Sequence, residues 1–181
     1  MPHPIRTLLA AGVAALAACS GGPAHRGAMA VSAGEQPAPG VLQDASVDRD
    51  TARVRAATAA FRSLDSAVAA GYPRSVTSCL SHPGVGAMGF HHVKPELVDD
   101  LVEVERPEIL LYSRGPGGEY VLNGVEYVVP YSVRPPDSTP PTVMGQRLKR
   151  SDPLRIWYLH AWVWKDNPAG LFADWNPEVE C

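Results

Sequence analysis

The sequence predicts an α+β fold, in which one long amphipathic N-terminal helix packs on an antiparallel β-sheet and a disulfide staples the domain. Three observations predict it: a stretch with helical periodicity comes first, β-rich runs separated by turn residues follow, and two cysteines bracket those runs. A leader is expected over residues 1–18, a flexible tether over 19–46 and a single globular domain over 47–181.

The helix is predicted between Asp48 and Ala70, where apolar side chains recur at steps of three and four residues. These side chains are Val54, Ala57, Phe61, Leu64 and Val68. This spacing places them along one face of a helix. An aspartate can cap the start of the helix, and Gly71 followed by Pro73 can end it.

Strand-forming runs occupy the second half of the domain. Residues 108–112 and 119–130 flank a glycine-rich turn and form the simplest hairpin. Within the second run, Asn123-Gly124 is either a further tight turn or a bulge. The run from Leu154 to Lys165 is apolar on both faces, which is typical of a central strand. The glycine-rich segment 82–92 is expected to be a loop.

The first 18 residues have the organisation of a secretory signal. One basic residue, Arg6, precedes an uncharged run that ends at Ala18 and, at about twelve residues, is too short to span a bilayer. The segment Leu16-Ala17-Ala18-Cys19 resembles the lipobox of bacterial lipoproteins. This resemblance implies a lipid anchor on Cys19 and a location in the cell envelope, outside the cytoplasm, on the outer membrane or the periplasmic face if the host is Gram-negative. An ordinary secretory signal cut near Ala28 or Ala30 is the alternative.

The net charge of the chain indicates which classes of partner are to be expected. The chain has 16 basic and 19 acidic side chains, a net charge of −3, and loss of the leader with its single arginine would make the charge −4. Such a balance gives no reason to expect nucleic acid or an anionic lipid surface as a partner. The expected membrane contact is the lipid on Cys19. The sequence does not identify a small ligand or an envelope protein partner.

The three cysteines are expected to have two different fates, one carrying lipid and the other two forming a disulfide. With Cys19 lipidated, Cys79 and Cys181 are an even pair in an oxidising compartment, where a disulfide is the default. It would close a loop of about 100 residues and stabilise the fold by about 4 to 5 kcal/mol in the chain-entropy model. The alternative, in which Cys79 is a nucleophile or a metal ligand, has only His82 nearby to support it.

The domain also contains a series of distinctive blocks. They are Ala-Ala-Gly-Tyr72, Met88-Gly-Phe-His91, Arg106-Pro-Glu-Ile-Leu-Leu-Tyr112, Gly124-Val-Glu-Tyr-Val-Val-Pro130, and His160-Ala-Trp-Val-Trp164 with Asn167-Pro-Ala-Gly170. Over about residues 55–181 they resemble a family of uncharacterised exported bacterial proteins. That family supplies no activity and no catalytic residues. In its members the position of His92 more often holds tyrosine, which favours His91 over His92 as a functional histidine.

The candidate metal ligands are His91, Glu126 and His160. Two imidazoles and a carboxylate are the ligand types of a divalent transition-metal site with open coordination positions, suited to zinc, iron or manganese. Their spacing matches no compact motif, and the His-x-His pattern of cupin-like barrels is missing. In the alternative, His160 packs among aromatic side chains with its nitrogens bonded to backbone, Glu126 lies on an exposed edge, and His91 bonds its own loop.

The sequence therefore favours a non-enzymatic binding or interaction module at the cell envelope. Its cofactor is not identified, and a divalent transition metal is the most concrete candidate ligand. A metal-dependent enzyme that uses His91, His160 and Glu126 is the alternative, in which the ion activates water or a substrate oxygen. A purely structural envelope lipoprotein is a third hypothesis. No Gly-x-Ser-x-Gly elbow is present, so serine hydrolysis has no support, and no residue is assigned a catalytic role.

Overall fold

A computed structural model of the chain describes residues 39–181, except 74 and 76. The predicted leader, the lipidation residue Cys19 and the first part of the tether lie outside the described residues. Within the described part, none of the helices combines the length and the apolar character needed to cross a membrane.

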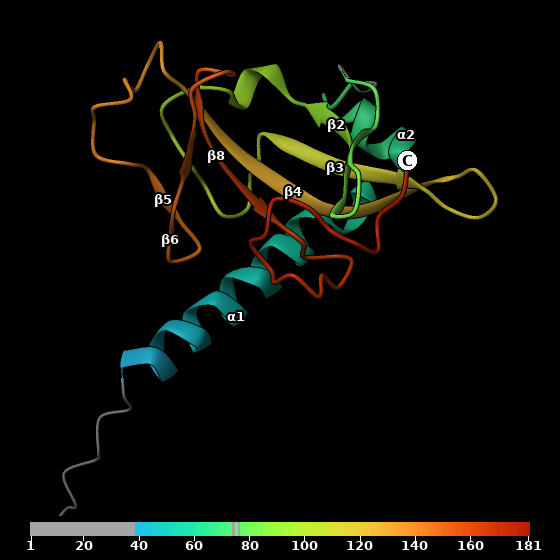
Figure 1. Cartoon of the computed structure of the whole chain (residues 1–181), viewed down its shortest axis with the longest axis horizontal. Coiled ribbons are helices and arrows are strands. Elements are labelled where there is room, and N and C mark those ends of the chain that lie inside the picture. The colour runs from blue at the N-terminus through green and yellow to red at the C-terminus, as the bar shows by residue number, and fades with distance from the viewer. Residues whose placement is uncertain (1–38, 74, 76) are drawn as a thin grey trace, which may run out of the picture. The chain divides into compact units, whose positions relative to one another are not determined.

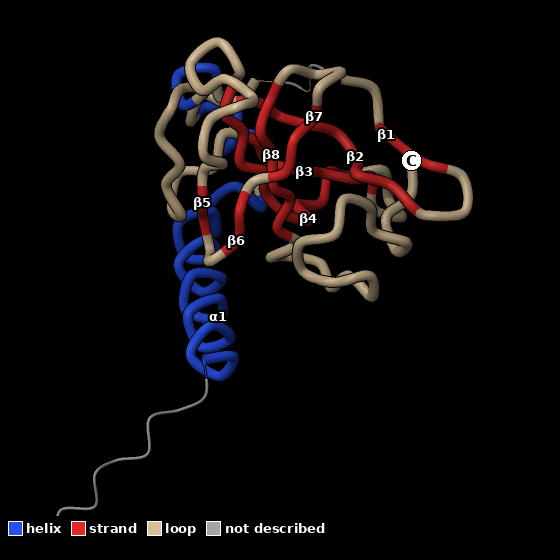
Figure 2. Tube along the Cα trace, turned by 60° about the vertical axis from the view of Figure 1, so that its left-hand side comes forward, coloured by secondary structure: helices blue, strands red, loops and turns tan. Residues whose placement is uncertain are grey.

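A curled antiparallel sheet forms the centre of the domain (Figures 1 and 2). Its six strands lie in the order β1-β2-β3-β4-β8-β7, and a separate two-stranded sheet pairs β5 with β6. The strands are β1 (Leu80–His82), β2 (Gly86–Val93), β3 (Ile109–Arg114), β4 (Tyr120–Pro130), β5 (Thr142–Val143), β6 (Gln146–Arg147), β7 (Lys149–Ser151) and β8 (Ile156–Ala161). The α+β class with an antiparallel sheet is thus confirmed.

The predicted hairpin is β3 and β4, and its register resolves the alternative at Asn123-Gly124. Leu111 pairs with Gly124, whereas the next residue, Tyr112, pairs with Leu122. Asn123 is therefore the extra residue of a bulge within one strand and does not form a second tight turn.

The segment 82–92 was expected to be a loop, and this expectation is wrong. Its second half is β2, whose last four residues pair with β3, and β1 pairs along the other edge of β2. Gly86 and Gly89 have φ values of +125° and +86°. Glycine adopts this region without strain, and Gly89 lies at the bulge of the β1–β2 hairpin. The turn of this hairpin is formed by residues 83–85, with Gly84 at a φ of +76°, and Gly86 already pairs with His82. The glycines shape the strand pair and do not prevent it.

The strongest predicted strand is present as β8, although it is shorter than the run from Leu154 to Lys165. It pairs with β4 on one side and with the short β7 on the other, so it has neighbours along both edges, as a central strand does. Trp157, Leu159 and Ala161 are buried on one face, and Tyr158 and His160 project from the other.

The continuous helix predicted over 48–70 is not what the structure has. Helix α1 (Pro39–Thr58) is followed by the 3₁₀ helix η1 (Ala59–Arg62) and by the short α2 (Leu64–Ala69). The break falls at Ser63, whose backbone is extended and whose hydroxyl accepts a hydrogen bond from the Ser66 amide. An N-cap serine begins a new helix, so it ends the preceding one. Helix α1 also starts inside the range expected to be tether.

The predicted apolar helix face is only partly buried. Val54 is fully buried, and Phe61 and Leu64 pack against the core, but Ala57 and Val68 are exposed. Among the described side chains of α1 the fully buried ones are Val54 and Thr58, so Ala57 lies beside the buried face, and in α2, which begins anew after Ser63, Ala67 is buried and Val68 is not. In Figure 1 the first turns of α1 extend beyond the sheet. Only the end of α1 and the segments after it cover β-structure.

The two faces of the sheet carry separate clusters of buried side chains. The larger cluster joins the helical segments to alternate residues of β3, β4 and β8, such as Leu110, Tyr127 and Leu159. The smaller one lies on the opposite face and includes Ile109 and Leu111. Because successive side chains of a strand point to opposite faces, residues 91, 126 and 160 belong to the face that the helices leave uncovered.

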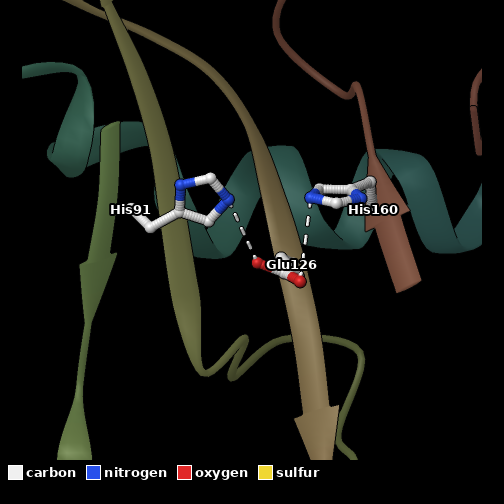
Figure 3. A group of neighbouring side chains, drawn as sticks. All are labelled: His91, Glu126 and His160. Carbon is white, nitrogen blue, oxygen red and sulfur yellow. Dashed lines mark ion pairs between the residues drawn. The ribbon is translucent and has the colours of Figure 1, made fainter. Parts of the chain in front are cut away.

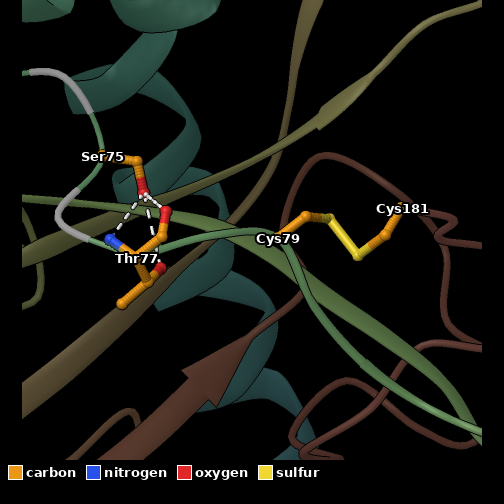
Figure 4. Close-up of a disulfide and its surroundings, with 4 residues drawn as sticks. All are labelled: Ser75, Thr77, Cys79 and Cys181. Carbon is orange, nitrogen blue, oxygen red and sulfur yellow. Dashed lines mark hydrogen bonds between the residues drawn. A yellow bond between two sulfur atoms is a disulfide. The ribbon is translucent and has the colours of Figure 1, made fainter.

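The C-terminal segment covers part of that second face and is held there by hydrogen bonds and a disulfide. The backbones of Asn176 and Ala87 exchange two hydrogen bonds, and the Trp162 indole donates to the carbonyl of Ala173 at 2.7 Å. The predicted disulfide Cys79–Cys181 is present, with a Cα–Cα distance of 5.6 Å (Figure 4). It joins the segment before β1 to the last residue of the chain, so Cys79 is neither a free nucleophile nor a metal ligand.

Candidate metal centre

The three predicted ligands come together from three strands of one sheet. His91 lies on β2, Glu126 on β4 and His160 on β8. Glu126 pairs directly with His160, and β3 separates it from His91. Figure 3 shows both imidazoles reaching towards the carboxylate, which lies between them, while the helix passes behind the sheet.

The distances suit a shared ion. Nε2 of His91 lies 3.5 Å from Oε2 of Glu126, and Nε2 of His160 lies 3.7 Å from Oε1 of the same carboxylate. One ligand atom from each residue can be chosen so that all three lie within 4.8 Å of one another. Zinc bonds of about 2.0 to 2.1 Å in tetrahedral geometry require ligand atoms about 3.3 Å apart. Small side-chain rotations would therefore complete the coordination.

Burying the three polar side chains without an ion costs free energy. The exposed fractions of His91, Glu126 and His160 are 7%, 5% and 1%. Among the described residues, Nδ1 of His91 and both ring nitrogens of His160 find no hydrogen-bond partner. Buried polar atoms are normally hydrogen-bonded, whereas the carboxylate oxygens nearest to the two His160 nitrogens lie at 3.7 and 3.8 Å, beyond hydrogen-bond distance. The structural alternative required backbone partners for His160 and an exposed edge for Glu126, and neither is observed. Its third part, an interaction of His91 with its own segment, has support in the backbone of Gly89.

Another element of that alternative is also present. The His160 ring packs edge-on against Tyr158, with centroids 5.7 Å apart, and stacks on Trp162 at 6.3 Å. These aromatic contacts hold the imidazole in place without using its nitrogens. They therefore hold the His160 ring in place while Nε2 lies near Glu126 and Nδ1 lies near Asp174.

The electrostatics favour the form of His91 that binds metals. Burial lowers the pKa of this imidazole, and nearby His160 lowers it further, while the Glu126 carboxylate acts in the opposite direction. A neutral imidazole is the form that donates a lone pair to a metal ion.

Sequence reasoning missed Asp174, which lies behind His160. Its Oδ1 is 3.8 Å from Nδ1 of His160 and 2.6 Å from the Lys149 ammonium. Although burial opposes ionisation, the His160 ring and Lys149 together lower the pKa of Asp174 to about 2. Metal-bound histidines commonly direct their second nitrogen at such a carboxylate, which orients the ring. The only sequence signal was an acid in the segment before Cys181.

His92 takes no part in the cluster. It projects from the opposite face of β2, where its Nδ1 lies 2.8 Å from the carbonyl oxygen of Pro73 and its ring contacts Tyr112 and Tyr120 edge-on. The strand alternation that brings His91 to the second face sends His92 to the core. The preference for His91 is therefore matched by the geometry.

A cavity of about 480 Å³ opens beside the cluster. Its wall includes the three candidate ligands and the hydroxyl residues Thr77 and Ser151. The other lining residues are mainly apolar: Leu80, Met88, Val93, Ile109, Leu154, Ile156 and Tyr158. An ion held by the cluster would thus face an apolar space large enough for a small molecule.

Comparison with known proteins adds no relative: no family model, curated protein or solved structure matches the chain. Any function must therefore be argued from the site itself.

Proposed function

We propose that this protein is a lipid-anchored, metal-binding module of the cell envelope, which holds a divalent transition metal on His91, Glu126 and His160. The observation that carries the metal proposal is the convergence of two buried imidazoles, with unpaired nitrogens, on one buried carboxylate. Such a set costs free energy when empty and gains it when an ion supplies the missing partner.

The ligand set also indicates what the ion does. Three protein ligands leave at least one coordination position open, as in catalytic zinc sites, whereas structural zinc sites are closed by four. All three ligand residues line the cavity of about 480 Å³, so a molecule in this cavity would reach an ion that they hold. The ion can therefore accept a further ligand, which suits a binding module. The same open position is what the alternative, a metal-dependent enzyme, requires to activate water.

Metal content tests the proposal directly. The full chain, produced in an oxidising compartment and loaded with Zn²⁺, is expected to retain about one ion per chain after gel filtration. His91→Ala and His160→Ala should each reduce this occupancy at least tenfold, because two remaining ligands hold zinc poorly. The measurement is elemental analysis together with circular dichroism, which confirms that the variants are folded.

His82→Ala is the matched control, because His82 is an exposed histidine of β1 outside the cluster. It should keep the wild-type metal content. A metal-free wild-type chain, or equal loss of zinc in the His82 variant, would contradict the proposal.

The anchor is supported by the sequence alone, through the Leu-Ala-Ala-Cys end of the leader and the tether that follows it. We expect the native protein to begin at a lipidated Cys19 and to partition into the detergent phase of a Triton X-114 extraction. Cys19→Ser should leave the protein in the aqueous phase, because the thiol that carries the lipid is gone. Intact mass spectrometry checks this, and a native product that still begins at Met1 would refute it.

A further inference from the structure

The cavity beside the metal cluster combines two properties that together specify a ligand. We propose that it binds a small apolar monoanion, of the class of a medium-chain carboxylate, whose acid group coordinates the ion while its tail occupies the cavity. This inference rests on the proposed metal site and names the ligand that completes it.

Charge complementarity determines the head group. A divalent ion held by two neutral imidazoles and the single carboxylate of Glu126 leaves a net charge of +1 at a nearly buried site. The adjacent Asp174 does not cancel this charge, because it forms an ion pair with Lys149 at 2.6 Å. A buried net charge is costly unless it is paired, so the open coordination position favours one negative oxygen ligand over a neutral one.

The residues that line the cavity indicate the chemistry of the ligand's tail. Seven of its twelve lining residues are aliphatic, methionine or tyrosine side chains. Apart from the cluster, the polar groups of the described wall are the hydroxyls of Thr77, Ser151 and Tyr158, and the Tyr158 hydroxyl donates a hydrogen bond to Asp174. Among the residues that the structure describes, which do not include Arg74, no lysine or arginine lines the cavity. A second charged or strongly hydrogen-bonding group on the ligand would therefore lose hydration with little compensation from the described wall, which disfavours sugars, nucleotides and dicarboxylates. An alkyl chain gains affinity instead, about fourfold for each buried methylene.

Titration calorimetry of the zinc-loaded full chain tests the proposal, with octanoate as the probe. Octanoate should bind at least tenfold more tightly than butanoate, which shares the head group, and than octan-1-ol, which shares the tail. Removing zinc with a chelator should weaken octanoate binding at least tenfold. In the Co²⁺-substituted protein, octanoate should shift the d–d absorption bands, because the carboxylate enters the coordination sphere.

A variant separates the cavity from the ion. Val93→Phe should fill part of the cavity and weaken octanoate binding at least tenfold while zinc content stays at the wild-type level, because Val93 lines the space without being a ligand. Val121→Phe is the matched control, since this valine lies on β4 at 40% exposure and outside the cavity. It should change neither zinc content nor octanoate affinity.

The two proposals fail in different ways. Absence of bound zinc would overturn the metal site itself. Stoichiometric zinc with octanoate binding no tighter than octan-1-ol, or with no effect of the chelator, would leave the metal site standing and overturn the monoanion proposal. Loss of octanoate binding in Val121→Phe as well would show that binding occurs elsewhere on the surface.

Discussion

Glu108→Gln is expected to stabilise the protein by about 4 kcal/mol at pH 8 and to leave its stability nearly unchanged at pH 4. Glu108 is an acid with 1% exposure immediately before β3, and its Oε2 accepts a hydrogen bond from the Val128 amide at 3.1 Å. Burial raises its pKa to about 8, against an ordinary value of 4.5. Sequence reasoning gave this residue no role beyond the start of a strand.

The sign of the pH dependence follows from this shift. The folded protein keeps the carboxyl protonated at a pH where the unfolded chain would ionise it, so the stability that Glu108 contributes is complete below about pH 4.5. It is lost as the pH rises towards 8. One pKa unit corresponds to about 1.4 kcal/mol, so the whole window amounts to about 4 to 5 kcal/mol. Glutamine keeps an acceptor oxygen for Val128 and cannot ionise, so it removes the loss.

Urea unfolding at pH 4, 6 and 8 measures the effect. The free energy of unfolding of the wild type should decrease across this series more steeply than that of the glutamine variant. Glu96→Gln, at an exposed acid of the 3₁₀ helix η2 (Pro95–Leu97), is the control and should follow the wild type. Parallel curves for wild type and Glu108→Gln would show that Glu108 does not titrate in the folded protein as proposed.

The second large effect is expected from the disulfide. Replacing Cys79 and Cys181 together by alanine should lower the free energy of unfolding by about 4 to 5 kcal/mol, because the bridge joins residues 102 positions apart in the chain and restricts the unfolded ensemble accordingly. The effect should extend to the second face of the sheet. Cys181 lies in the same C-terminal segment as Asn176, which pairs with Ala87, and Asp174, which faces His160.

Denaturant unfolding with and without a phosphine reductant provides the measurement. Reduction should destabilise the wild type to the level of the double variant and should leave the double variant unchanged, which controls for other effects of the reductant. A double variant within about 1 kcal/mol of the wild type would mean that the unfolded chain is restricted by other means. Zinc content of the reduced protein then reports whether the C-terminal segment supports the candidate metal centre.

Much of the local structure could be predicted from residue patterns. Alternating apolar runs identified β4 and β8, and the glycine-rich turn between residues 112 and 119 identified the β3–β4 hairpin, because side-chain periodicity is a property of a single strand. The same logic failed for β2, since glycines that break one strand can equally shape a bulged one. It failed for the helix because a serine in an extended conformation starts a new helix, and the apolar spacing continues across the break.

By itself, the sequence predicted the pairing of Cys79 with Cys181 from the number of cysteines, and the α+β class and the identities of the three candidate ligands from residue type and local order. Only the tertiary structure decided that His91, Glu126 and His160 meet, that Asp174 lies behind His160 and that an apolar cavity adjoins them. The physical reason is that their proximity depends on strand order, register and the curl of the sheet. These are set by contacts between segments distant in the chain, and no local pattern of residues records them.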